Sequence, residues 1–436
     1  MPETAPALVI AAPASNSGKT VLTLALLRAF RNSGRRMASF KAGPDYIDPA
    51  FHAAASGRPC FNLDPWAMRE ESQTAVLRDV SDDADLIIGE GVMGLFDGAR
   101  DGTGSTADLA SRWSLPVLLI VDAKGQGASV AALLEGFDRH RPDLRLAGVL
   151  FNRVGGGGHV EMLKQAAAKA GIPMLGAIPL NPALQLEHRH LGLQQARERQ
   201  DIEVFLEAAA THVAAHADLE QIAGLARPAD LPETRGGGLA PLGQHIAIAE
   251  DDAFAFLYPH LMASWRRQGA TLSFFSPLAD EAPAPEADAI FLPGGYPELY
   301  AGKLASATKF KAGMQKTATS DKVIYGECGG FMALGRSLTD RDGATHEMLN
   351  LLPVTTSFAA PKRHLGYRKA RLTQNCILGN KDARFAAHEF HYASLVSNEA
   401  TTPLFEIEDA TGAPLGLTGA IERRIAGSFI HLIDGM

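Results

Sequence analysis

Short apolar runs alternate with longer stretches of helical periodicity along most of the chain. Each run has the length and composition of a buried β-strand. The runs lie at 8–12, 85–90, 115–122 and 145–152, and then at 245–250, 287–293 and 322–326. Strands that alternate with helices are typical of α/β folds with mostly parallel sheets. The pattern therefore predicts an α/β protein.

A segment rich in proline and glycine interrupts this pattern at 225–243, ARPADLPETRGGGLAPLGQ. Such a composition is typical of a linker between domains. We therefore expect two domains, residues 1–224 and 244–436, for which a chain of 436 residues has room. No internal repeat is evident.

Composition excludes several classes of protein. No apolar run approaches the roughly 20 residues that cross a membrane, and the N-terminus lacks the basic region of a signal peptide. The net charge of −8 argues against nucleic-acid binding. The 3 cysteines are too scattered for a disulfide framework or a zinc motif. We expect a cytoplasmic protein with small-molecule partners, and a homodimer is left open.

The first apolar run leads into a phosphate-binding motif. After Leu8–Ile10 the chain reads AAPASNSGKTVLTLALL, in which Ser17-Gly18-Lys19-Thr20 opens a helix with apolar periodicity. In a P-loop the backbone N–H groups and the lysine hold phosphates, and the threonine hydroxyl binds Mg²⁺. Pro13 stands where the full motif has glycine. Strand, loop and helix in this order favour ATP binding over a coincidental match.

Polar residues close the next apolar runs. Glu90 ends the run at 85–90 and is followed by Gly-rich chain up to Asp97, while Asp122 and Asn152 end the two later runs. A strand-end carboxylate facing a P-loop commonly supports Mg²⁺, although a solvated acid is the alternative. Ligands of open parallel sheets bind beyond the carboxyl ends of the strands, so these ends should meet in one crevice.

The segment 39–68, SFKAGPDYIDPAFHAAASGRPCFNLDPWAM, is too irregular for a plain helix and has the character of a functional loop. Lys41, Asp45 and Asp48 could serve phosphate and metal. Tyr46 and Trp66 could line a flat ligand surface, and buried anchors are an equally good interpretation.

The run KVIYGECGGFMALG places a cysteine in a tight turn. The spacing Gly326-x-Cys328-x-Gly330 between a strand and a helix is that of a nucleophile elbow. A helix N-terminus lowers the pKa of a thiol, so we expect a reactive Cys328. An inert buried cysteine is the alternative.

Two other segments extend this hypothesis. The turn after AIFL at 289–292 is Pro293-Gly294-Gly295, and the N–H of Gly295, with that of Gly329, could form an oxyanion hole. His431, in AGSFIHLIDGM, could serve as the base. These segments together resemble the class I (triad) glutamine amidotransferase domain. Its triad has glutamate two residues after the histidine; here that position is Ile433, with Asp434 out of phase.

The N-terminal half resembles the dethiobiotin-synthetase-like and MinD-like branch of P-loop proteins, which implies that Asn152 meets adenine. One half would then release ammonia and the other bind ATP and Mg²⁺. Ammonia does not condense with a carboxylate until ATP has phosphorylated it. The combination predicts a glutamine-dependent amide-forming synthetase.

Four segments, at 39–68, 90–99, 291–301 and 325–335, are similar to those of the cobyrinic acid or hydrogenobyrinic acid a,c-diamide synthase family. This resemblance implies amidation of the a and c acetates of a corrin. It also implies the roles of the site residues. Lys19, Thr20 and Glu90 serve ATP–Mg²⁺; Asp45, Asp48 and Asp97 lie near the reacting carboxylate; Cys328 and His431 form the glutaminase.

A polycarboxylate substrate needs local positive charge, and KRHLGYRKAR at 362–371 is the best match, with Arg363 and Arg368 as ligands. A solvated basic face is the alternative. In HEFHY at 388–392 an HxxH pair indicates metal only weakly because no third ligand is evident. We interpret it as a strand.

Three other activities stay open. A nickel-sirohydrochlorin a,c-diamide synthase would make the same two amides, and a cobyric acid synthase would amidate other side chains. A P-loop ATPase switch without synthetase activity is a different class, and Cys328 would have no role in it.

Overall fold

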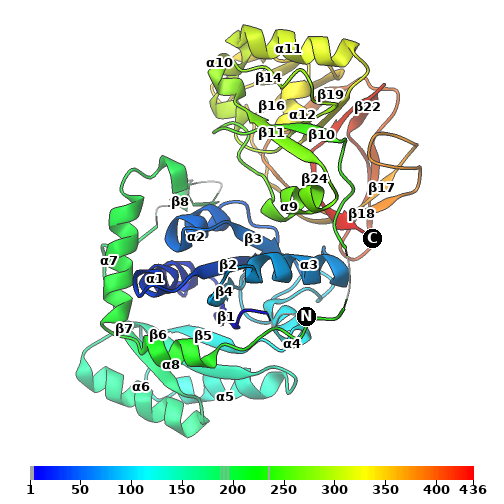
Figure 1. Ribbon diagram of the computed structural model, residues 1–436. Helices are drawn as coiled ribbons and strands as arrows, with labels where there is room; N and C mark the ends of the chain where they lie inside the picture. Colours follow the sequence, from blue (N-terminus) through cyan, green and yellow to red (C-terminus); the bar gives the residue numbers. More distant parts are fainter. Residues whose placement is uncertain (1–3, 187, 190–191, 194–195, 234–235) are drawn as a thin grey trace. The chain divides into compact units, whose positions relative to one another are not determined.

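The computed structural model describes residues 4–186, 188–189, 192–193, 196–233 and 236–436 (Figure 1). The described residues of Met1–Trp66 and Glu70–Gly236 form one compact unit. Those of Ala67–Arg69 and Gly237–Met436 form a second. The three residues Ala67–Arg69 thus belong to the second unit although they lie in the N-terminal half of the sequence. The expected linker at 225–243 includes 234–235, which lie outside the described residues.

The first unit is built on a seven-stranded sheet in which every neighbouring pair is parallel, in the order β3-β2-β4-β1-β5-β6-β7. Its strands are β1 (Ala7–Ala11), β2 (Met37–Ala42), β3 (Cys60–Leu63), β4 (Leu86–Glu90), β5 (Val117–Asp122), β6 (Leu146–Val154) and β7 (Met174–Pro179). A short pair, β8 (His188–Arg189) and β9 (Gly192–Leu193), stands apart from this sheet.

Helices connect these strands. They are α1 (Lys19–Asn32), α2 (Asp48–Ser56), α3 (Glu70–Ser81), α4 (Thr106–Arg112), α5 (Val130–His140), α6 (Gly157–Ala170), η1 (Ala196–Glu198), α7 (Ile202–Ala214) and α8 (Leu219–Leu225). In Figure 1, α1, α2 and α7 lie side by side, and α5 packs on α6. Strands β1 and β4 are buried along their whole length, which explains why they read as unbroken apolar runs. The four apolar runs predicted as strands are β1, β4, β5 and β6.

The second unit contains a six-stranded sheet in the order β11-β10-β12-β13-β23-β22. Its strands are β10 (His245–Ala249), β11 (Thr271–Phe275), β12 (Ala289–Leu292), β13 (Val323–Glu327), β22 (Ala420–Glu422) and β23 (Ile425–Ser428), and only the β22–β23 pair is antiparallel. Its helices are α9 (Pro259–Arg267), η2 (Pro277–Ala279), η3 (Pro297–Leu299), α10 (Ala301–Ser306), α11 (Thr308–Thr319) and α12 (Gly329–Leu334). The three predicted strands of this half are β10, β12 and β13.

Two further sheets follow in the last third of the chain. One has the order β15-β14-β16-β19, with β14 (Ser337–Thr339), β15 (Thr345–Glu347), β16 (Val354–Ser357) and β19 (Ser394–Asn398). The other is antiparallel, β21-β20-β17-β18-β24, with β17 (His364–Leu372), β18 (Arg384–His391), β20 (Phe405–Asp409), β21 (Pro414–Thr418) and β24 (Ile430–Gly435). HEFHY was interpreted as a strand, and its first four residues end β18.

Both units are α/β folds around parallel sheets, as predicted. Among the described helices, none has the length and the apolar character needed to cross a membrane.

Candidate functional site

The P-loop of the first unit presents the open end of a long helix. Gly18, just before α1, has φ 85°, a conformation that glycine adopts without strain. A Cβ at Gly18 would lie 2.2 Å from Nδ2 of Asn152, which donates a hydrogen bond to the Ser17 carbonyl oxygen at 2.9 Å. Asn152 therefore packs directly against the loop. The helix begins without a side-chain cap, so its first N–H groups can receive an anion.

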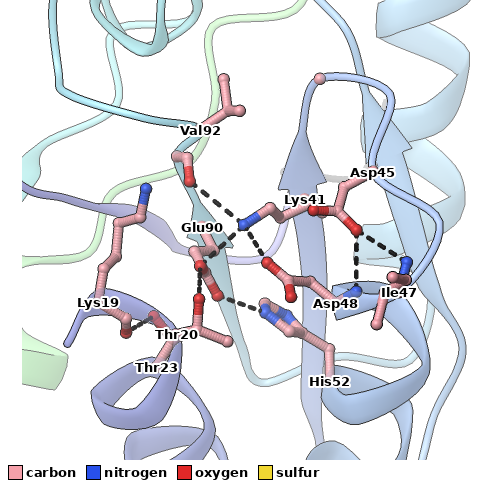
Figure 2. A network of polar contacts seen from close by, with 12 residues as sticks. Lys19, Thr20, Thr23, Lys41, Asp45, Ile47, Asp48, His52, Glu90 and Val92 are labelled. Atoms are coloured by element: carbon pink, nitrogen blue, oxygen red, sulfur yellow. Dashed lines mark hydrogen bonds and ion pairs between the residues drawn. The ribbon is translucent and has the colours of Figure 1, made fainter. Parts of the chain in front are cut away.

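Behind the loop lies a buried network of charged groups (Figure 2). The Thr20 hydroxyl donates to Glu90 Oε1 at 2.7 Å. The Lys41 ammonium donates to the same oxygen at 2.8 Å and to Asp48 Oδ2 at 2.6 Å. His52 Nε2 lies 2.7 Å from Glu90 Oε2. Glu90 at the end of β4 thus organises groups from α1, β2 and α2, and His52 is a member of the network that no sequence motif indicated.

These contacts shift the ionisation of each group. Burial opposes the charge of Lys41, but Asp48 and Glu90 outweigh it and raise the lysine pKa. Burial likewise opposes the charge of Glu90, and Lys41 with His52 lowers its pKa overall. Burial and the neighbouring Asp45 raise the pKa of Asp48 to about 6. Asp48 is therefore the acid of this network that is protonated most easily, first because it is buried and then because Asp45 lies nearby.

Lys19 faces the same space. Its ammonium donates to the Met93 carbonyl oxygen at 3.0 Å. Burial and the nearby Lys41 lower its pKa to about 8. A bound phosphate would raise the pKa of Lys19 again, since an anion stabilises the ammonium.

One cavity of about 540 Å³ collects these residues. It is lined by the P-loop residues Gly18, Lys19 and Thr20, by Lys41, Asp45, Asp48 and Glu90, and by Asn152 and Arg153 near the end of β6. The expectation that strand ends share one crevice is confirmed for β1, β4 and β6, whereas Asp122 of β5 is not among the described residues that line the cavity. Its other side, 178–181, 184–186 and His212, was not predicted. The volume lies in the range of ligand pockets, roughly 300–1,000 Å³.

Two predicted residues, Asp45 and Asp97, have local structural contacts. Asp45 Oδ1 accepts hydrogen bonds from the N–H groups of Ile47 and Asp48, which fixes the start of α2. Asp97 Oδ2 accepts from the Gly94 N–H at 2.8 Å. Tyr46 and Asp97 are not among the described residues that line the cavity, and their substrate roles stay predictions.

In the second unit, Cys328 forms the predicted elbow between β13 and α12. Its backbone has φ 48° and ψ −103°, a strained conformation for a residue with a side chain. A Cβ at Gly330 would lie 1.9 Å from the Leu292 carbonyl oxygen, so the crowding that calls for glycine is present. The geometry is that of a nucleophile on a sharp strand-to-helix turn.

The expected low pKa of the thiol is wrong. Burial, followed by the charge of Glu298, raises the pKa of Cys328. Helix α12 has only six residues, and its small dipole does not outweigh the loss of hydration. A thiolate must therefore form together with a proton acceptor.

His431 is the predicted acceptor. It is fully buried on β24, and burial lowers its pKa well below the usual value. A Cβ at Gly294 would lie 2.4 Å from His431 Cε1 and 3.3 Å from Cys328 Cβ. The two side chains, about 100 residues apart in sequence, therefore converge over a glycine that leaves room for both.

Two backbone segments adjoin the thiol. A Cβ at Gly329 would lie 3.0 Å from the Gly295 nitrogen, so the two predicted oxyanion-hole residues are neighbours. A Cβ at Gly295 would lie 2.1 Å from the Ala253 carbonyl oxygen. This turn can approach Cys328 so closely only because these residues are glycines.

The acids near His431 differ from those expected. The Asp434 carboxylate is bound by Arg69, whose Nη2 and backbone N–H lie 2.8 and 2.9 Å from it. Glu327, next to Cys328 in sequence, places Oε2 3.7 Å from His431 Nδ1. The signal that could have indicated Glu327 is its position at the end of β13, directly before Cys328. The sequence of one strand does not show which residues of other strands lie close to it.

Comparison with known proteins identifies both units. Residues 8–193 match the CobQ/CobB/MinD/ParA nucleotide binding domain, and residues 245–435 match the CobB/CobQ-like glutamine amidotransferase domain. The hydrogenobyrinate a,c-diamide synthase of Rhizobium meliloti (strain 1021) is 53% identical over 98% of this chain and 99% of its own. The chain belongs to the hydrogenobyrinate a,c-diamide synthase family.

Other members agree. The proteins of the same name from Brucella anthropi and Rhodobacter capsulatus are 51% and 48% identical, each over 98% of both chains. The chain is accordingly an amide-forming ligase with a glutamine amidotransferase domain and an ATP-binding domain. The family resemblance predicted from the motifs is confirmed.

Two arginines of the basic segment 362–371 are paired with acidic side chains of the protein, which was not expected for a corrin site. Arg368 pairs with Glu389 Oε2 at 2.7 Å, and Arg371 pairs with Asp382 and Glu406. Arg363 is exposed just before β17. The predicted substrate role is therefore carried more readily by Arg363 than by Arg368.

Only one histidine of the predicted HxxH pair, His391, belongs to a group of possible metal ligands; His388 is not part of it. Ligand atoms of His364, Glu389 and His391 lie within 4.8 Å of one another. However, Glu389 is already bound by Arg368 and by His391 Nε2 at 3.0 Å. The rings of His364 and His391 stack with an interplanar angle of 4°, so their in-plane lone pairs do not converge. We interpret this cluster as an ion-pair network and not as a metal site.

Proposed function

We propose that the chain amidates the a and c acetate side chains of a corrin, hydrogenobyrinic or cobyrinic acid, using glutamine and ATP. The proposal rests on one observation above all. A single chain carries both a P-loop cavity with buried acids and a Cys328–His431 pair on an elbow. Its relatives over the full length are named hydrogenobyrinate a,c-diamide synthases.

The glutaminase half-reaction follows from the second unit. The Cys328 thiol gives its proton to His431 as the sulfur attacks the side-chain carbonyl carbon of glutamine. The oxyanion is bound by the N–H groups of Gly295 and Gly329. His431 returns the proton to the leaving nitrogen, ammonia departs, and water cleaves the thioester to glutamate. Because burial raises the pKa of Cys328 and lowers that of His431, the neutral thiol and imidazole are the favoured forms before the reaction.

The synthetase half-reaction follows from the cavity of the first unit. A corrin carboxylate oxygen attacks the γ-phosphorus of ATP, and ADP leaves. Ammonia then attacks the acyl carbon, and phosphate leaves with the electron pair of the broken C–O bond. Lys19 and the N–H groups of the P-loop hold the phosphates, and Asn152 is proposed to meet adenine.

The donor set of this cavity fits Mg²⁺, which prefers hydroxyl and carboxylate oxygens. Thr20 and Glu90 would hold the ion, with Asp45 or Asp48 in support. When bound, Mg²⁺ neutralises the phosphate charge that develops during transfer. Lys41 remains a fixed positive charge between Glu90 and Asp48 and keeps both acids ionised near the reacting groups.

The domain assignment is part of the proposal. We propose residues 1–224 as the amide synthetase and residues 244–436 as the glutaminase, with 225–243 as the linker. The short segment Ala67–Arg69 is the exception, since it is part of the second compact unit.

Mass spectrometry of the tetrapyrrole product tests this function. Protein, ATP, Mg²⁺ and glutamine are offered hydrogenobyrinic acid, cobyrinic acid or nickel sirohydrochlorin in parallel reactions. Two OH-to-NH₂ replacements on one of the two corrins are expected. Amidation of nickel sirohydrochlorin alone would assign the other branch, and ATP hydrolysis without any amide would contradict the proposal.

The Cys328→Ala variant separates the half-reactions. We expect it to lose glutamine-dependent amidation and to keep amidation from added ammonia. A switch ATPase would be indifferent to this substitution, and normal synthesis from glutamine would overturn the role of Cys328.

A further inference from the structure

The proposed glutaminase lacks the usual acid for its histidine. In the class I pattern a glutamate stands two residues after the histidine, and here the buried, apolar Ile433 occupies that position. A catalytic imidazole needs a partner that fixes its tautomer and orientation. The structure must supply that partner from another part of the chain.

Glu327 is held in place by two donors on one of its oxygens. Its Oε1 accepts a hydrogen bond from the Leu432 N–H at 3.0 Å and another from the Tyr325 hydroxyl at 3.1 Å. The Leu432 N–H belongs to the residue that follows His431, so the carboxyl group is tied to the backbone of the base. Its other oxygen, Oε2, is left pointing at His431 Nδ1, 3.7 Å away.

The other acids near His431 are engaged elsewhere or face the thiol. Asp434 is paired with Arg69, and Glu389 with Arg368 and His391. Glu298 acts on Cys328. The remaining titratable neighbours that affect His431 are histidines, His388 and His391. Glu327 places Oε2 3.7 Å from His431 Nδ1, within the range of an ion pair.

We propose that Glu327 is the positioning residue of this glutaminase, replacing the acid missing at 433. In the reacting complex its Oε2 accepts the Nδ1–H of His431. This contact leaves Nε2 with a lone pair directed at Cys328, and it stabilises the imidazolium that forms when the thiol proton moves to Nε2. No bond is made or broken at Glu327. The inference rests on the glutaminase role proposed above.

The ionisation of the pair supports a contact that tightens during reaction. Burial raises the pKa of Glu327 to about 8, and burial lowers that of His431. Each charge is costly alone, but the imidazolium favours the carboxylate and the carboxylate favours the imidazolium. A 3.7 Å separation that shortens when substrate binds is consistent with such behaviour.

Substitution of Glu327 by glutamine gives the sharpest test. In Glu327→Gln the amide oxygen still accepts from Leu432 and Tyr325, so the fold is preserved. Its NH₂ group now faces Nδ1 and favours the tautomer with the proton on Nε2, which cannot act as a base. We expect kcat/KM for glutamine hydrolysis to fall about 10²- to 10⁴-fold. Amidation from added ammonia should stay within about twofold of wild type, because the first unit is untouched.

Two matched variants distinguish positioning from structure. Glu327→Asp keeps the charge and should retain more activity than Glu327→Gln. Tyr325→Phe removes one hydrogen bond from the same oxygen and keeps the carboxylate, so its loss should stay below about tenfold. Wild-type kcat/KM should also rise with pH around the ionisation of Glu327, and this limb should move in Glu327→Gln.

A structural role alone would lower stability without moving the pH profile. The proposal is overturned if Glu327→Gln hydrolyses glutamine within threefold of wild type, or if Tyr325→Phe is impaired as severely. An inactive wild type would instead contradict the glutaminase function itself. Thermal unfolding of each variant, together with ammonia-dependent synthesis, establishes that a loss does not come from misfolding.

Discussion

The two sites of this chain solve the burial of ionisable groups in opposite ways. In the first unit, Lys41, Glu90 and Asp48 are buried together and neutralise one another, so the charges are permanent. In the second unit, burial raises the pKa of Cys328 and lowers that of His431, so desolvation favours the neutral forms of both. A phosphate is bound by groups that are already charged. A cysteine nucleophile has to be charged only when it attacks glutamine. Burial therefore accompanies paired, charged groups at the first site and favours neutral groups at the second.

The strongest challenge to this comparison is removal of the central cation of the first unit. Lys41→Met leaves Glu90 and Asp48 buried without their shared partner, and we expect the free energy of unfolding to fall by about 3–5 kcal/mol. Chemical denaturation measures this change. The exposed Lys124→Met is the matched control and should have little effect. An equally stable Lys41→Met would show that the charges are not mutually compensated.

A methyl group placed between the two reactive side chains probes the second unit. Gly294→Ala puts a Cβ 2.4 Å from His431 Cε1, and the imidazole must move. We expect glutamine hydrolysis to fall by about 10²-fold, with ammonia-dependent amidation retained. The control is Gly302→Ala, where the nearest atom to the new Cβ would be 3.5 Å away. Unchanged hydrolysis in Gly294→Ala would contradict the convergence of Cys328 and His431.

The pH dependence of stability sharpens the contrast. Burial opposes the charge of His52, but Cys60 and Glu90 raise its pKa from 6.5 to about 10. A raised pKa means that the folded state binds the proton more tightly, so this stabilisation is complete below pH 6.5 and is lost as pH rises to about 10. Denaturation at several pH values should show the decline. His52→Gln should flatten this part of the curve, and an identical slope would contradict the ion pair.

The smallest effect is expected at Glu298. Burial raises its pKa to about 8, so it becomes charged only in alkaline solution. That charge raises the pKa of Cys328, second to burial. Glu298→Gln should therefore speed alkylation of Cys328 by iodoacetamide a few-fold above pH 8 and leave the rate at pH 6 unchanged. An effect of equal size at pH 6 would assign the change to access and not to charge.

Local patterns along the chain were sufficient to predict much of both sites. Ser17–Thr20 and Gly326–Gly330 are contiguous motifs in which glycines mark the tight turns of the backbone. Both fold as predicted. Strands such as β1 and β4 were recognised because they are buried on both faces and read as apolar runs. The antiparallel β17 was not predicted as a strand and β18 only at its end, because neither is an unbroken apolar run.

The missed features depend on contacts between distant segments. Glu327 acquires its place beside His431 from the approach of β24 to β13, and His52 acquires its place from the packing of α2 behind Glu90. The error over the pKa of Cys328 has the same origin. A helix N-terminus is a local signal, but burial of the thiol is set by the whole unit.

The path of the chain between its units has a consequence for their separation. Residues Ala67–Arg69 leave the N-terminal sequence to complete the second unit, where Arg69 binds the fully buried carboxylate of Asp434. A fragment that begins after the linker would lack this arginine and leave a buried charge without its counterion. Such a fragment would lack part of the second compact unit. The second unit therefore includes a segment that precedes the linker in sequence. We expect that cutting the chain in the linker does not give two fragments that each contain a whole unit.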